Sequence, residues 1–309
     1  MVESTPTKND PYRYRLHGLT VESELLLPEL VPCDRTDAPD VSILLGKTPP
    51  RLSQPRTKGV CYEIQPGQML IWLDGVARFL ISGGSEITVD PNGTGNAAET
   101  RRLLLSSPLG SLLLQRGLLP LHASAVSIGG EGVVFLGGPC AGKSTLAAML
   151  WKRGFRILSD DLTVIRIVEN GAVWILPGFP QLRLWPDSLV ALGEDAEQFT
   201  WMRNDIEKRL VSCRESFESS AVPLSAIYYL EPSYQRELEV SPLRGVRGAC
   251  ALLQHTYSPA FLAGSGLQKG HLAQLTRLAK STRMMSLARP ESDVIAKDLA
   301  ECVLGDFRS

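Results

Sequence analysis

An eight-residue loop motif constrains this 309-residue chain more than any other feature of its sequence. Residues 137–144 match the phosphate-binding pattern G-x-x-x-x-G-K-[ST]. Glycine at both fixed positions lets the backbone turn its N–H groups toward phosphate oxygens, the lysine brings a cation to the β and γ phosphates, and the serine hydroxyl can ligate Mg²⁺. We expect ATP and Mg²⁺ to bind here. The expected binding residues are Gly137, Gly138, Pro139, Cys140, Ala141, Gly142, Lys143, Ser144 and the following Thr145.

The residues on either side of the loop fit a strand–loop–helix–strand unit. Residues 132–136 form a short apolar run of the kind a buried strand uses, and residues 155–158 form a second. Between them, apolar residues recur at helical spacing and Gly154 stands where a C-terminal cap belongs. Ligands of open α/β sheets bind at the carboxyl ends of strands. The loop and the Asp160-Asp161 pair, which follows the second strand, should therefore face one crevice.

This carboxylate pair is the second chemical signal in the sequence. Neighbouring residues of a strand point to opposite faces, so Asp160 and Asp161 can divide their work. One carboxylate can hold the metal, and the other can accept a proton from an attacking hydroxyl. The structural alternative is a pair that only caps a turn.

Three further sites carry polar residues of interest. His122 lies in an apolar run one hairpin ahead of the loop, which predicts either a ring near the γ phosphate or a structural histidine. Arg183 is a lone cation in a proline-bracketed apolar segment, and it either neutralises charge during phosphoryl transfer or forms a surface salt bridge. Lys208 and Arg209 follow acidic residues and indicate a charged helix face.

Composition bounds the remaining possibilities. With 44% hydrophobic and 21% charged residues the chain is expected to be globular, and its net charge of −1 gives no indication of nucleic-acid or membrane binding. The six cysteines include no CxxC pair, which argues against zinc and disulfides and favours the cytoplasm.

The residue pattern changes along the chain and predicts two domains. Residues 11 to about 94 contain short alternating runs broken by Pro, Gly and Asp turns, which predicts a mostly antiparallel β domain over residues 1–95. Residues 91–95 are the expected linker. Residues 96–309 predict an α/β domain, which opens with two short helices split at Pro108. Its later helices are expected at 246–254, 271–280 and 293–303.

The order of these features resembles the catalytic domain of HPr kinase/phosphorylase. A histidine in an apolar strand, a hairpin, the loop, a short helix and the run Gly-Phe-Arg-Ile-Leu-Ser-Asp-Asp at 154–161 are similar to that family, over roughly residues 118–168 and loosely to about 305. The resemblance implies the P-loop kinase fold shared with phosphoenolpyruvate carboxykinases. It also implies that Asp160 is the general base, that Asp161 joins Ser144 at the metal, and that His122 lies beside the γ phosphate.

Where the sequence departs from that family, it predicts a different acceptor of the phosphoryl group. The glycine-rich segment that HPr kinases use for their protein substrate is absent, and residues 176–187 and 222–231 stand in its place. These segments, together with the front of the chain, are similar to HPr-kinase-related enzymes of lasso-peptide biosynthesis, which phosphorylate the C-terminal serine of a precursor peptide. The hypothesis is an ATP-dependent serine kinase with a peptide substrate. The alternatives are a kinase of a small metabolite such as free serine and a nucleotide-gated binding protein. The oligomeric state and the role of residues 1–95 stay open.

Overall fold

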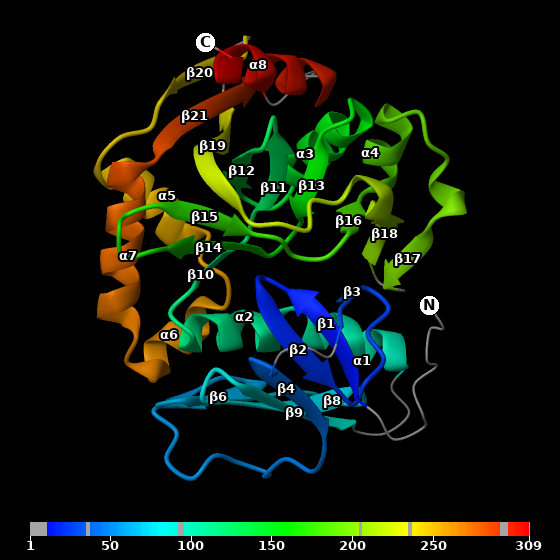
Figure 1. Cartoon of the computed structure of the whole chain (residues 1–309), viewed down its shortest axis with the longest axis vertical. Helices are drawn as coiled ribbons and strands as arrows, with labels where there is room; N and C mark the ends of the chain where they lie inside the picture. Colours follow the sequence, from blue (N-terminus) through cyan, green and yellow to red (C-terminus); the bar gives the residue numbers. More distant parts are fainter. Residues whose placement is uncertain are drawn as a thin grey trace. The chain divides into compact units, whose positions relative to one another are not determined.

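The computed structural model of the chain describes residues 11–34, 38–91, 96–203, 206–233, 237–290 and 296–308. The chain divides into two units, the first of Met1–Leu118 with Ser258–Lys269 and the second of Leu119–Tyr257 with Gly270–Ser309 (Figure 1). This division falls later than the expected boundary at 95/96, because the helices between 97 and 115 pack on strands of the first unit. The expected linker, beyond Pro91, lies outside the described residues.

One mixed sheet forms the body of the first unit. Its strand order is β3-β1-β2-β4-β9-β8-β7-β6-β5, with parallel pairing at β2–β4 and β4–β9 and antiparallel pairing elsewhere. Alternation along the strands sets the buried face; in β8, for example, Ala77, Phe79 and Ile81 are buried. The strands are β1 (Tyr12–Leu16), β2 (Leu19–Ser23), β3 (Val31–Pro32), β4 (Val41–Leu45), β5 (Thr57–Lys58), β6 (Tyr62–Gln65), β7 (Gln68–Leu73), β8 (Ala77–Ser82) and β9 (Glu86–Pro91).

Three helices accompany this sheet. Helices α1 (Ala97–Leu104) and α2 (Ser107–Gln115) confirm the predicted split, with Pro108 in the first turn of α2. Helix α2 contacts β8 and β9. The third helix, α6 (Pro259–Ser265), comes from far along the sequence and packs on β6, where Gly264 lies so close to Ile64 that a Cβ there would meet its side chain at 2.8 Å.

The second unit is built on a central sheet of order β10-β14-β15-β19-β12-β11-β13, with β21 on β19 and β20 on β21. The strands are β10 (Leu119–Leu121), β11 (Ser124–Ile128), β12 (Glu131–Gly137), β13 (Arg156–Ser159), β14 (Thr163–Ile167), β15 (Val173–Leu176), β19 (Val222–Ser233), β20 (Glu239–Pro242) and β21 (Arg283–Pro290). The helices are α3 (Lys143–Lys152), α4 (Pro186–Ala191), α5 (Val246–Gln254), α7 (Gln268–Ser281) and α8 (Ala296–Arg308). A separate three-stranded sheet joins β16 (Gln181–Leu184), β18 (Ile206–Ser212) and β17 (Thr200–Arg203).

The position of β11 explains how the loop and the carboxylate pair meet. β11 pairs antiparallel with both β12 and β13, so those two strands run in the same direction on either side of it. Their carboxyl ends, Gly137 and Ser159, therefore lie at one edge of the sheet, as predicted. The same edge receives the start of β11, because an antiparallel strand begins where its partner ends. His122, just before β11, is brought to the loop in this way.

Alternation along β12 separates two cores. Val133 and Phe135 face a cluster that includes α3 and α8, whereas Val134 and Leu136 face a cluster that includes α5 and α7. A buried strand with helices on both faces reads as a continuous apolar run, which is what residues 132–136 show. The loop thus follows a strand that is held on both sides.

The later helices follow the sequence prediction. Helix α5 has the predicted bounds, α7 includes the predicted 271–280, and α8 overlaps the predicted 293–303, whose first three residues lie outside the described chain. The prediction for Lys208 and Arg209 was wrong, because they lie on β18 and not on a helix. Adjacent charges fit this strand because neighbouring side chains point to opposite faces, where Arg209 lies over Trp201 and Lys208 over Trp185.

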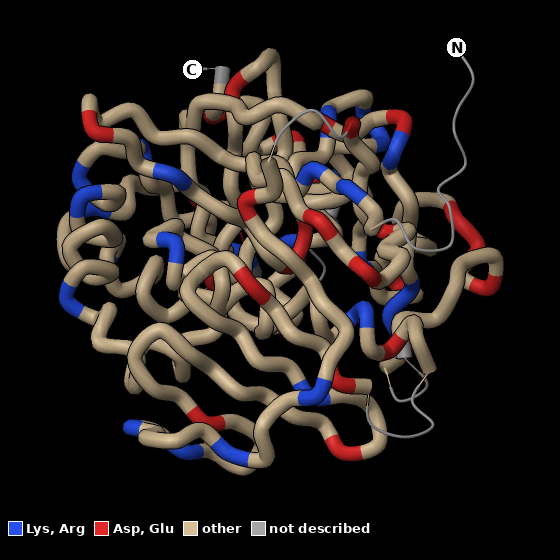
Figure 2. Tube along the Cα trace, turned by 60° about the horizontal axis from the view of Figure 1, so that its bottom comes forward, with Lys and Arg blue, Asp and Glu red and all other residues tan. Residues whose placement is uncertain are grey.

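Charge is mixed over the molecule. Figure 2 shows basic and acidic residues interspersed along both units, in keeping with the net charge of −1. Within the described chain, no helix is long and apolar enough to cross a membrane.

Candidate active site

The loop motif links β12 to α3 through two constrained glycines. Gly142 has a φ of 96° and caps the helix that begins at Lys143. At Gly137 a Cβ would lie 2.8 Å from the carbonyl oxygen of Leu230, so a larger residue does not fit. The Lys143 ammonium donates to the carbonyl oxygens of Gly137 and Gly138 at 2.8 and 3.1 Å, and burial lowers its pKa. Because the Lys143 ammonium is already buried in the folded protein, a phosphate that binds it need not strip much further water from it.

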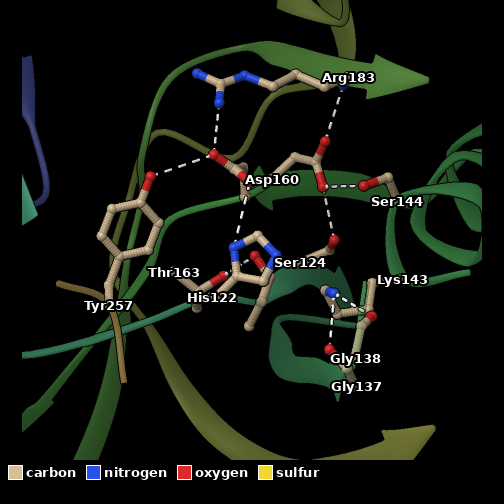
Figure 3. A network of polar contacts seen from close by, with 12 residues as sticks. His122, Ser124, Gly137, Gly138, Lys143, Ser144, Asp160, Thr163, Arg183 and Tyr257 are labelled. Atoms are coloured by element: carbon tan, nitrogen blue, oxygen red, sulfur yellow. Dashed lines mark hydrogen bonds and ion pairs between the residues drawn. The ribbon is translucent and has the colours of Figure 1, made fainter. Parts of the chain in front are cut away.

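Asp160 is the hub of the hydrogen-bond network at the edge of the sheet (Figure 3). Its Oδ1 accepts from the hydroxyls of Ser124 at 2.6 Å and Ser144 at 2.8 Å, and its Oδ2 accepts from the backbone N–H of Arg183 at 2.8 Å. The residue is only 5% exposed. Asp160 therefore joins the end of β13 to the serine of the loop motif.

Asp161 points to a different set of partners. Its φ of 69° lies in the left-handed region, and its carboxylate contacts none of the Ser124, Ser144 and backbone N–H groups that bind Asp160 among the described residues. The carboxylate receives the Arg183 guanidinium, lies 3.3 Å from Nδ1 of His122, and accepts from the Tyr257 hydroxyl at 3.4 Å. Two donors, Arg183 and Tyr257, and the nearby His122 ring thus surround Asp161 at the cavity wall.

A cavity of about 620 Å³ opens beside the loop, a volume in the usual range for small-molecule sites. Its wall includes Asp161 but not Asp160. The lining residues are His122, Pro139, Cys140, Ala141, Gly142, Lys143, Ser144, Thr145, Asp161, Arg183, Trp185, Asp187, Ser188, Lys208, Arg289 and Leu299.

Most of the predicted site residues meet at this cavity, with two differences. Gly137 and Gly138 do not line it but hold Lys143 through their carbonyls. Asp160, expected as the general base, is turned toward Ser144, and Asp161, expected at the metal, faces the open space. Asp160 thus accepts from the loop serine while Asp161 faces the cavity, and strand alternation does not apply to the pair, because β13 ends at Ser159.

Arg183 and His122 both line the cavity next to Asp161, where each could act on a bound substrate. Arg183 is 9% exposed and its ion pair with Asp161 lies at the cavity and not on the outer surface. His122 is partly exposed and lines the cavity. Burial lowers the pKa of His122 despite the neighbouring Asp161, so the ring is neutral at neutral pH.

Sequence reasoning missed Ser124 and Tyr257. Ser124 interrupts an apolar strand two residues after His122, and that interruption was a usable signal. Tyr257 had no local signal, because it reaches the site only through a long-range pairing in which its N–H donates to the Pro120 carbonyl at 2.8 Å. Burial, followed by the charge of Asp161, raises the pKa of Tyr257, so it stays a hydroxyl donor.

The residues at the loop fit a magnesium ion. No group of three or more His, Cys, Asp or Glu side chains gathers as a metal site within the described ranges. Mg²⁺ does not need one, because it is commonly held by one or two protein oxygens together with phosphates and water. The Ser144 hydroxyl and the Asp160 carboxylate, 2.8 Å apart, supply such oxygens.

His255, beside the site, makes stability depend on pH. Burial, followed by the charges of Lys143 and His122, lowers its pKa from 6.5 to about 4. Between these values the unfolded chain binds a proton that the folded chain does not, so we expect the free energy of unfolding to fall as pH drops from 6.5 to about 4. Denaturant unfolding of wild type and His255→Gln across this range measures the difference. Equal pH dependence in both proteins would contradict the prediction.

Sequence comparison finds a local similarity to one class of protein. No protein-family model matches the chain. It shows local sequence similarity to HPr kinase/phosphorylase. The relative from Bacillus pumilus (strain SAFR-032) is 34% identical over 134 residues, which is 40% of this chain and 42% of the relative. The chain thus matches less than half of that protein's length.

One of the solved structures that match the chain is described as a kinase of similar name. The Hpr(Ser) kinase/phosphatase from Coxiella burnetii matches with a TM-score of 0.33 and 12% identity, over 61% of this chain and 95% of that chain.

Proposed function

We propose that this chain is an ATP-dependent, Mg²⁺-requiring kinase that transfers the γ-phosphoryl group to a serine hydroxyl. The observation that carries the proposal is the hydrogen bond between Ser144 of the loop and Asp160 at the end of β13, with Asp161 turned into the cavity beside them. P-loop enzymes use such a pair of loop hydroxyl and strand-end carboxylate at the metal. The local similarity to HPr kinase/phosphorylase supports the same class.

In the proposed reaction the serine Oγ attacks the γ-phosphorus. The bond from that phosphorus to the β–γ bridging oxygen breaks, the bridging oxygen leaves with the electron pair as part of ADP, and the hydroxyl proton passes to Asp161. His122 and Arg183 orient the Asp161 carboxylate through the contacts described above. Lys143 stabilises the phosphate charge. Ser144 and Asp160 would hold Mg²⁺, which when bound neutralises charge on the β and γ phosphates.

The acceptor that we propose is the C-terminal serine of a lasso-peptide precursor. Support comes from the segment 176–187, which stands where the resemblance leads one to expect the glycine-rich segment of HPr kinases and which contributes Arg183, Trp185 and Asp187 to the cavity wall. A change in the part of the wall that faces the acceptor is what a change of acceptor requires. HPr is therefore not the proposed substrate.

The test is a phosphotransfer assay read by mass spectrometry. The protein is incubated with ATP, Mg²⁺ and a precursor peptide ending in serine, and we expect the peptide to gain the mass of one phosphate group. Controls are the same peptide ending in alanine and the Lys143→Met variant, both of which should stay unmodified. Phosphorylation of free L-serine in place of the peptide would favour the metabolite alternative. ATP binding without transfer to either acceptor would favour a nucleotide-gated binding protein.

A further inference from the structure

The small sheet β16–β18–β17 places two basic residues of β18 on opposite faces. Arg209 is 2% exposed, packs its guanidinium 3.9 Å from the Trp201 ring and pairs with Glu197 at 3.1 Å. Lys208 points to the other face, where its ammonium lies 5.5 Å from the Trp185 ring and lines the cavity. Arg183 stands opposite Leu210 in the same ladder, so its side chain shares the face of Lys208. One face of this sheet thus presents Arg183, Trp185 and Lys208 to the cavity.

Lys208 differs from the other cations at the cavity because its ammonium has no hydrogen-bond or ion-pair partner among the described residues. Lys143 is held by loop carbonyls at the phosphate position, Arg183 is paired with Asp161, and Arg289 donates to the Cys140 carbonyl at 3.3 Å. Within the described residues, Lys208 forms no ion pair, not even with Asp187, the remaining carboxylate of the wall. A cation that is stacked on tryptophan but unpaired is ready for an anion from outside the chain.

Lys208 lines the same cavity as the residues proposed to act in phosphoryl transfer, among them Lys143, His122 and Asp161. In keeping with this, burial and the positive charge of Lys208 both lower the pKa of His122 and of Lys143. Lys208 therefore lies within electrostatic reach of the proposed phosphate-binding lysine and of the histidine that contacts Asp161. An anion on Lys208 would lie near the hydroxyl whose proton Asp161 takes.

We propose that Lys208 recognises a carboxylate next to the acceptor hydroxyl, namely the terminal α-carboxylate of a peptide that ends in serine. This inference rests on the proposed function. In a terminal serine, only Cβ and Cα separate the hydroxyl oxygen from the carboxylate, whereas an internal serine carries a neutral amide there. Lys208 would thus make the enzyme favour chain ends over internal serines, since a cation gains more from a carboxylate than from a neutral amide oxygen.

The experiment compares two forms of one probe, a synthetic Ala/Gly peptide ending in serine, as the free acid and as the C-terminal amide. Binding is measured with a non-hydrolysable ATP analogue and Mg²⁺ present, and transfer is measured separately with ATP. We expect wild type to favour the free acid by about tenfold to a hundredfold in both readouts, the range for a hydrogen bond to a charged group. In Lys208→Gln the preference should disappear, with ATP affinity unchanged.

Lys152→Gln is the matched control. Lys152 also lies over a tryptophan, 5.2 Å from the Trp151 ring, but it pairs with Glu194 and does not line the cavity. This variant should keep the wild-type preference.

The outcomes separate the two proposals. An equal preference in wild type and Lys208→Gln, or no preference in wild type binding, overturns the inference whether or not phosphate is transferred. Weakened ATP binding in Lys208→Gln with the preference intact also overturns it and assigns Lys208 to the nucleotide. Displacement of the peptide by equimolar free L-serine overturns the assignment to a peptide end. A Lys208-dependent binding preference without any transfer supports the inference and counts against the kinase function alone.

Discussion

Asp161→Asn is expected to lower kcat for phosphoryl transfer by about 10²–10⁴-fold, the usual contribution of a general base. The amide cannot take the hydroxyl proton, but it keeps the size of the carboxylate. Asparagine also tolerates the φ of 69° at this position, so the backbone turn should persist. ATP affinity and the Mg²⁺ concentration needed for half-maximal activity should change little. Steady-state kinetics and nucleotide titration measure these quantities.

The contradictory result is a variant with near-normal kcat and a raised Mg²⁺ requirement. It would restore the assignment implied by the family resemblance, with Asp161 at the metal. Thermal unfolding of the variant serves as the folding control, because the loss of an ion pair with buried Arg183 has its own effect on stability.

Asp160→Asn is expected to raise the Mg²⁺ concentration for half-maximal activity by at least about 10–100-fold, because the loss of a group that merely orients a metal ligand already costs that much and Asp160 is proposed to hold the metal itself. The carboxylate accepts from Ser144 at 2.8 Å, so its replacement removes an anionic oxygen and misdirects that hydroxyl. The serine hydroxyls can reorient to accept from the new amide, whereas the Arg183 N–H keeps the amide oxygen. The fold should therefore survive.

The measurement is activity as a function of Mg²⁺ in both aspartate variants. Partial recovery of Asp160→Asn at high Mg²⁺, with no recovery of Asp161→Asn, is the expected contrast. A defect in Asp160→Asn that stays the same at every Mg²⁺ concentration would speak against its role at the metal and for a role as the base.

The sequence predicted the local unit that carries the loop, because its signals are local. The apolar run at 132–136, the helical spacing after Lys143 and the cap at Gly154 each depend on a few neighbouring residues. The edge of the sheet shared by the loop and the Asp160-Asp161 pair also followed from strand direction. His122 reached the cavity for the same reason, through one hairpin.

Features that depend on distant pairing or on a single backbone angle could not be predicted. Tyr257 joins the site through a contact with Pro120, and α6 returns to the first unit from beyond residue 258. Strand alternation does not describe Asp160 and Asp161, because they follow the end of β13 at Ser159 and Asp161 has a left-handed φ. Lys208 was mistaken for part of a helix, since neighbouring charges carry no period of their own.

The left-handed turn at Asp161 also limits which residues evolution can place at this position. Glycine, asparagine and aspartate are the residues that adopt such a conformation at low cost, so drift at this position is confined to a short list. Aspartate codons reach asparagine or glycine codons by a single base change. A descendant of this chain could therefore lose the proposed proton acceptor without losing its shape, and homologues with Asn or Gly at this position should be sought among nucleotide-binding proteins that have given up catalysis.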